Sequence, residues 1–163
     1  QLGYPCRILT EYLGAEAREA GFVDASIALT IERMNEPLKS PIVLISSGET
    51  VVTVGKEHGI GGRNQEYCMA AAIAIDGSKR IVFGAVDTDG TDGPGGFVFE
   101  GAPECLAGAI VDSETLTEAR NHHIDFWAAL KSHGTSEPLW RLGCGVAATS
   151  NVSALDLRVI LVM

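Results

Sequence analysis

The chain has 163 residues, of which 46% are hydrophobic and 20% charged, and its formal net charge is −9 at pH 7. This length and composition are typical of one globular domain with a sizeable core, and they exclude a disordered chain. The acidic balance argues against nucleic acid or an anionic membrane as the main partner, since both select basic faces. The sequence also lacks an apolar run long enough to span a membrane and a signal-peptide pattern.

Strand and helix patterns alternate along the chain. We expect buried strands at residues 6–9, 42–46, 51–54, 80–86 and 157–162, an edge strand at 97–99, and helices at 11–35, 64–76, 112–121 and 124–131. This alternation predicts an α/β fold, with a mixed, largely parallel sheet flanked by helices. The chain starts without methionine and passes almost at once into a strand, so we expect it to be a piece of a longer polypeptide.

Four scattered cysteines bear on redox chemistry and location. Cys6, Cys68, Cys105 and Cys144 form no C-x-x-C motif, so zinc and redox sites have little support. Free, scattered thiols fit a reducing cytosol better than secretion, and we expect a cytoplasmic protein.

A polar turn follows the strand at residues 42–46. The carboxyl end of a buried strand is where open α/β sheets place their ligands. Glu49 lies in this turn. Its carboxylate could hold a metal ion, orient an arginine or simply be solvated.

A glycine loop leads into the alanine-rich helix at residues 64–76. Gly59, Gly61 and Gly62 come directly before Arg63 and Asn64. A helix N-terminus and an arginine beside it suit an anion such as phosphate or carboxylate. The spacing fits neither a P-loop nor a complete G-x-G-x-x-G, and the alternative is a tight connection that carries a surface arginine.

The strand at residues 80–86 runs into an acidic, glycine-rich loop. Asp87, Asp89 and Asp92 lie within six residues, which favours a hard cation over any other ligand class. An EF-hand is excluded because Asp92 stands where that loop needs its glycine. The alternative is a solvated turn. Beside the Arg63 loop, the acidic loop would complete a Mg²⁺–phosphate site.

The order of these motifs resembles the MOFRL domain, the C-terminal domain of two-domain glycerate kinases, some of which carry the older label hydroxypyruvate reductase. The resemblance covers roughly residues 37–163, with residues 1–36 as the leading strand and helix. It rests on the segments SGET at 47–50, GGRNQE at 61–66, TDGTDGP at 88–94, AIVD at 109–112, and Asn151 with DLRVILV at 156–162. Residues 95–106 and 144–152 depart from the family pattern and leave the true substrate open.

The resemblance implies an ATP-dependent, Mg²⁺-requiring kinase that phosphorylates D-glycerate. Its active site would lie in a cleft against a larger, Rossmann-like N-terminal domain, and this chain alone would be inactive. Arg63 and Asp89 would be catalytic, Asp89 and Asp92 would bind the metal, and the substrate or phosphate would be bound by Glu49, Asn64, Glu66, Thr91 and Asn151.

Two other functions stay open at this point. The first is an NAD(P)-dependent hydroxypyruvate reductase, although the incomplete dinucleotide fingerprint speaks against nucleotide binding of that kind in this chain. The second is a non-catalytic module that binds a small anion or another protein. The oligomeric state is also open, with a homo-oligomer as one option.

Overall fold

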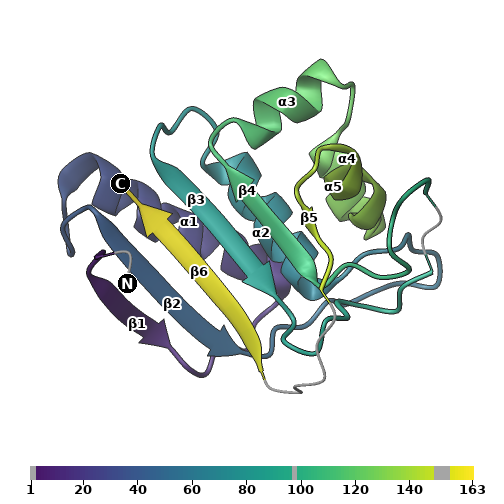
Figure 1. Cartoon of the computed structure of the whole chain (residues 1–163), viewed down its shortest axis with the longest axis horizontal. Helices are drawn as coiled ribbons and strands as arrows, with labels where there is room; N and C mark the ends of the chain where they lie inside the picture. The colour runs from purple at the N-terminus through teal and green to yellow at the C-terminus, as the bar shows by residue number, and fades with distance from the viewer. Residues whose placement is uncertain (1–2, 97–98, 149–154) are drawn as a thin grey trace.

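The computed structural model describes residues 3–96, 99–148 and 155–163 of the chain. A six-stranded sheet has the order β1-β2-β6-β3-β4-β5. Its strands are β1 (Cys6–Thr10), β2 (Ile42–Gly48), β3 (Ile81–Val86), β4 (Gly108–Asp112), β5 (Gly145–Val146) and β6 (Asp156–Val162). The helices are α1 (Ala17–Met34), α2 (Arg63–Ala74), α3 (Thr115–Asn121), α4 (Phe126–Ser132) and α5 (Ser136–Arg141). The longer helices α1 and α2 lie behind the sheet, and the three short ones lie on its β4–β5 side (Figure 1).

The prediction of an α/β domain with a mixed sheet flanked by helices is confirmed, but the sheet is not largely parallel. Only β1 and β2 pair in parallel, whereas the other four neighbouring pairs are antiparallel. The chain crosses from β2 through α2 to β3, and these two strands do point the same way. However, β6 returns between them in the opposite direction, and the described part of the link from β3 to β4 contains no crossover helix.

The central strands bury one face of the sheet and leave the other open. Buried and more exposed residues alternate along β2, β3 and β6, as the two-residue period of a strand requires. Buried side chains such as Leu44, Phe83 and Ile160 form a core with α1 and α2. On the opposite face, no helix covers the described strands in Figure 1, and the alternation leaves Ile110 and Leu157 exposed.

Two predicted elements differ from the structure, and a third cannot be compared with it. Helix α1 begins at Ala17 rather than near residue 11, because the preceding residues bond to β2 and to the segment after it, as Leu13 N does to Ser47 O. The strand expected at 51–54 is reduced to one bridge between Glu16 and Val51. The edge strand expected at 97–99 lies mostly outside the described residues. Helix α5 was not expected, and it tolerates Pro138 because the proline stands in the first helical turn.

Within the described residues, no helix has the length and apolar character needed to cross a membrane. All four cysteines are free thiols.

Candidate active site

The topology gathers three carboxylates where the central strands β2 and β3 end and β6 begins. Because β6 runs antiparallel between β2 and β3, its first residues lie beside the ends of both neighbours, and Gly48 pairs with Asp156. Glu49 and Asp87 follow directly after β2 and β3. Three segments that are distant in the sequence therefore bring Glu49, Asp87 and Asp156 together.

Arg63, the first residue of α2, stands between these three carboxylates. Its Nε donates to Asp156 Oδ2 at 2.8 Å and its Nη2 to Asp156 Oδ1 at 2.9 Å. Asp156 therefore binds the guanidinium in a bidentate manner. Nη2 also donates to Asp87 Oδ2 at 2.8 Å, and Nη1 to Glu49 Oε1 at 3.1 Å. Arg63 stands at the start of a helix as predicted, and of the three options left open for Glu49 the contact corresponds to the one in which it orients an arginine.

Burial separates the partners of Arg63 into fixed and movable groups. The side chain of Asp156 is 0% exposed and that of Asp87 is 8% exposed, whereas that of Glu49 is 62% exposed. Burial raises the pKa of Asp87, against the lowering effects of the Asp89 backbone bond and the Arg63 charge. Burial alone would lower the pKa of Arg63, but Asp156, Asp87 and Glu49 raise it above its ordinary value. The guanidinium is therefore charged and held from its inner side.

Asp92 caps helix α2 from a distant loop. Its Oδ1 accepts the backbone N–H of Asn64 at 3.0 Å, and its Oδ2 accepts that of Gln65 at 2.9 Å. The side-chain amides of Asn64 and Gln65 bond to Asp92 as well. Asp92 is 1% exposed, and burial raises its pKa to about 6 against the lowering effect of these bonds. Both oxygens that would ligate a metal are thus occupied, and the helix N-terminus offers its first amides to Asp92 rather than to a ligand.

Two glycines make this cap sterically feasible. A Cβ on Gly62 would collide with the backbone and the carboxylate of Asp92, and one on Gly93 would collide with the carbonyl of Gly61. Gly93 also has a φ of +99°, a conformation that L side chains rarely adopt. The glycines of both loops are therefore needed for the close approach of the loops to each other.

Asp89 lies three residues from Asp92 in a very different environment. Its Oδ1 accepts the backbone N–H of Thr91 at 2.8 Å and the Thr91 hydroxyl at 2.7 Å. These two bonds lower the pKa of Asp89, so that the exposed carboxyl is ionised at neutral pH. Thr91 thus shapes the Asp89 turn. Among the described residues, no group of three histidine, cysteine or acidic side chains has the arrangement to hold a metal ion.

Glu66 lies one helical turn after Arg63 and pairs with a residue that the sequence interpretation did not select. Its Oε1 bonds to His133 Nδ1 at 2.8 Å, and burial raises the pKa of Glu66, against the lowering effect of His133. His133 adopts a left-handed backbone conformation just after α4, with φ of 56°. The sequence contains no signal for this pair, because its members lie 67 residues apart. Asn151, also predicted to bind ligand, falls outside the described residues.

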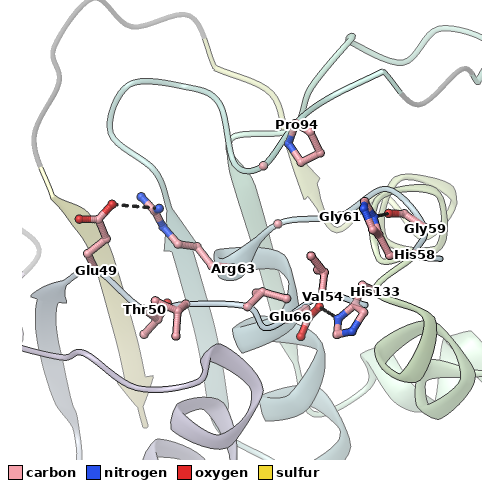
Figure 2. A pocket seen from close by; sticks show the side chains of 14 residues that line it. Glu49, Thr50, Val54, His58, Gly59, Gly61, Arg63, Glu66, Pro94 and His133 are labelled. Atoms are coloured by element: carbon pink, nitrogen blue, oxygen red, sulfur yellow. Dashed lines mark hydrogen bonds and ion pairs between the residues drawn. The ribbon is translucent and has the colours of Figure 1, made fainter. Parts of the chain in front are cut away.

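A pocket of about 510 Å³ connects these features. Figure 2 shows Arg63 and Glu49 at one side of it, and Glu66 with His133 at the other. Its remaining wall is formed by residues of the 50–62 segment and of the acidic loop: Thr50, Val51, Val52, Val54, His58, Gly59, Gly61, Gly62, Gly93 and Pro94. The structure therefore brings the predicted residues Arg63, Glu49 and Glu66 together around one cavity, with Asn64 and Asp92 beneath it as supports.

Two buried charges missed by the sequence interpretation complete the site. Asp156 and Arg158 are both 0% exposed, and they lie on the same face of β6 because they are two residues apart. Charged residues in an otherwise apolar strand are a signal that could have identified them, because such residues are rarely buried without a partner.

Comparisons with known proteins agree with this architecture. The D-glycerate 2-kinase of Thermotoga maritima is 40% identical over 141 residues, which are 86% of this chain and 31% of the relative. An Agrobacterium vitis relative named as a putative hydroxypyruvate reductase is 36% identical over 157 residues. The match covers 95% of this chain and 34% of the relative's length. The crystal structure of a Thermotoga maritima glycerate kinase superposes with a TM-score of 0.89 at 37% identity, covering 99% of this chain and 37% of that structure.

The chain thus spans about a third of the length of these proteins. The family model described as the MOFRL family matches residues 42–152, which contain Glu49, Arg63 and the acidic loop. The match covers more than half of the sequence, and the chain belongs to the MOFRL family.

Proposed function

We propose that this chain is the C-terminal domain of an ATP-dependent glycerate kinase, which transfers the γ-phosphoryl group of ATP to D-glycerate. The observation that carries the proposal is the Arg63 guanidinium, which Asp156 and Asp87 hold from the inner side at the edge of a pocket. The names of the relatives in Thermotoga maritima support the choice of reaction.

Arg63 would stabilise the negative charge on the phosphoryl group during transfer. Asp156 fixes the Nε and Nη2 atoms, and among the described residues Nη1 bonds only to the exposed Glu49. A ligand anion would take the place of Glu49 at Nη1 without disturbing the buried partners. Phosphoryl transfer requires mainly positioning and charge stabilisation, which such a preorganised arginine provides.

Asp89 is the residue that best fits the Mg²⁺ ion implied by this reaction. Its carboxyl is exposed and ionised, whereas both oxygens of Asp92 are engaged by the α2 backbone. Mg²⁺ in kinases commonly takes one or two carboxylates and completes its shell with water and phosphate oxygens, so that a cage of three side chains is not required. The bound ion would neutralise charge on the transferred phosphate.

A further domain would complete the site, as the relatives are about three times as long as the matched region. The sheet face opposite α1 and α2, with Ile110 and Leu157 exposed, offers an apolar surface for that domain to cover. The free thiols of all four cysteines support a reducing, cytoplasmic location.

A chimera tests the proposed function. This chain would replace the aligned third of the Thermotoga maritima relative, and ADP release from Mg²⁺–ATP would be measured with and without D-glycerate. We expect glycerate-dependent turnover, and we expect Arg63→Ala to lower kcat by about 10² to 10³, the usual effect of losing one strong transition-state contact. Arg33→Ala, at an exposed position on α1, is the matched control and should leave kcat unchanged.

Two other outcomes would redirect the assignment. Consumption of NADH with hydroxypyruvate in the absence of ATP would favour the reductase, the function named for the Agrobacterium vitis relative. A folded chimera that is silent in both assays would favour a non-catalytic binding module. An Arg63→Ala chimera with wild-type turnover would remove Arg63 from the mechanism.

A further inference from the structure

Arg158 is a fully buried cation next to the proposed site. Its side chain is 0% exposed, and its Nη2 donates to Thr50 Oγ1 and to Asp156 Oδ2, each at 2.8 Å. Its guanidinium carbon lies 5.3 Å from the centre of the Tyr67 ring. The Nε and Nη1 atoms have no hydrogen-bond partner among the described residues. Burying a permanent charge with unsatisfied N–H groups is costly, so the position calls for an explanation beyond core packing.

The shared carboxylate of Asp156 provides that explanation. Its Oδ2 accepts from Arg63 Nε and from Arg158 Nη2, and its Oδ1 accepts from Arg63 Nη2. Asp156 is thus clamped between an inner and an outer arginine. The Ser47 hydroxyl fixes the Asp156 backbone by donating to its carbonyl at 2.9 Å.

Arg158 also holds the turn after β2 that carries Glu49. Thr50, its second partner, is 1% exposed and directly follows Glu49. One guanidinium therefore connects the turn that carries Glu49 with the carboxylate that holds Arg63. A shift of that turn or of the Asp156 carboxylate would change the orientation in which the Arg63 guanidinium binds an anion.

The charges around Arg63 also indicate a role for Arg158 in the site. Arg63 is surrounded by three carboxylates, those of Glu49, Asp87 and Asp156. This excess of negative charge would repel a phosphate at the Nη1 edge of Arg63. A second, buried positive charge at Asp156 offsets part of it at short range and low dielectric.

We infer that Arg158 is a positioning residue for phosphoryl transfer, which acts through Asp156 to hold the Arg63 guanidinium in its working orientation. This inference rests on the proposed function. Arg158 itself is not among the residues that line the pocket, so its effect on catalysis is indirect.

The test combines two readouts. In the ¹⁵N-labelled 163-residue chain, NMR would follow hydrogen exchange of the Arg63 Nε–H group, assigned by its loss in Arg63→Lys. In the chimera, kcat and KM for ATP and glycerate would be measured. We expect Arg158→Met to accelerate Nε–H exchange at Arg63 at least tenfold and to lower kcat by about 10², as for other displacements of a catalytic group. Arg33→Met is the control and should change neither quantity.

A merely structural role predicts a different result. Arg158→Met would then lower the melting temperature but leave Arg63 exchange and the kcat of the folded protein at wild-type values, and that result would overturn the inference. If Arg158→Met fails to fold, Arg158→Lys keeps the charge and one bond, and it should show a smaller change in the same direction. Wild-type values for folded Arg158→Lys would equally count against the inference. If the wild-type chimera is inactive, the proposed function fails, but the exchange measurement still decides the role of Arg158.

Discussion

Asp89 and Asp92 belong to one loop and are three residues apart, yet they perform opposite tasks. Asp92 is buried, and its two oxygens hold the first amides of α2. Asp89 is exposed, and its Oδ1 accepts two hydrogen bonds from Thr91 in the same turn. The comparison teaches that one acidic motif can contain both a buried, structural carboxylate and an exposed, ionised one, and that burial distinguishes them. The two residues can therefore be separated by experiment.

The largest expected effect is on stability. Asp92→Ala would leave two buried backbone N–H groups without acceptors, and each such loss costs roughly 1–3 kcal/mol. We expect the free energy of unfolding to fall by about 3–4 kcal/mol, measured by urea denaturation. Asp89→Ala is the matched control in the same loop and should lower the urea midpoint far less, because it removes only exposed bonds to Thr91. Equal midpoints for the two variants would contradict the assignment of Asp92 as the cap.

The second prediction concerns pH. The pKa of Asp92 is about 6 in the fold, above the ordinary 3.8. Between these values the unfolded chain has lost the proton that the folded chain still binds, so the contribution of Asp92 to stability is greatest at low pH and falls as pH rises through 6. At 1.36 kcal/mol per pKa unit the loss is up to about 3 kcal/mol.

The difference in unfolding free energy between wild type and Asp92→Ala isolates this contribution. It should shrink as pH increases from 4 to 7. The raised pKa values of the partly or fully buried Asp24, Glu66 and Asp87 act in the same direction, but they cancel in the difference. A difference that stays constant over this range would show that the pKa of Asp92 is not raised.

The smallest effect is expected at the rim of the pocket. Glu49 is exposed and occupies the Nη1 atom of Arg63, where a ligand anion would bind. Glu49→Gln removes a competing charge, and inorganic phosphate should bind the chain about two- to fivefold more tightly by calorimetry, the range of a weak exposed ion pair. Weaker binding would instead show that Glu49 contacts the ligand directly, as the sequence interpretation also allowed.

Much of the fold could be predicted because the signals were local. The apolar runs of β2, β3 and β6 and the glycine loop before α2 are properties of short segments. Strand direction was not predictable in this way, because nothing in the sequence of residues 156–162 indicates that they insert between β2 and β3. The length of α1 was overestimated because the bonds from residues 13–17 to β2 and to Val51 override a continuous helical spacing.

The site was predicted in part for the same reason. Arg63 follows glycines and begins an apolar helix, which is a local pattern, and its placement at the pocket follows. The task of Asp92 depends on a contact with Asn64 and Gln65 across 27 or 28 residues, and that of Asp156 on a contact across 93. The His133 partner of Glu66 was equally out of reach. Composition around these residues could suggest chemistry but not identify which carboxylate does which task.

The position of β6 also has a consequence for the order in which the protein is made. Among the described strands it is the last in the sequence, yet it lies inside the sheet, between β2 and β3. Until it emerges, β2 and β3 lack the neighbour that joins them, and the guanidinium of Arg63 lacks Asp156. Pairings between such distant segments form slowly, because the entropy of closing a long loop is lost before the contacts between the strands can stabilise the pair. A nascent chain in which β6 has not yet emerged therefore cannot assemble the full set of carboxylates that holds the Arg63 guanidinium.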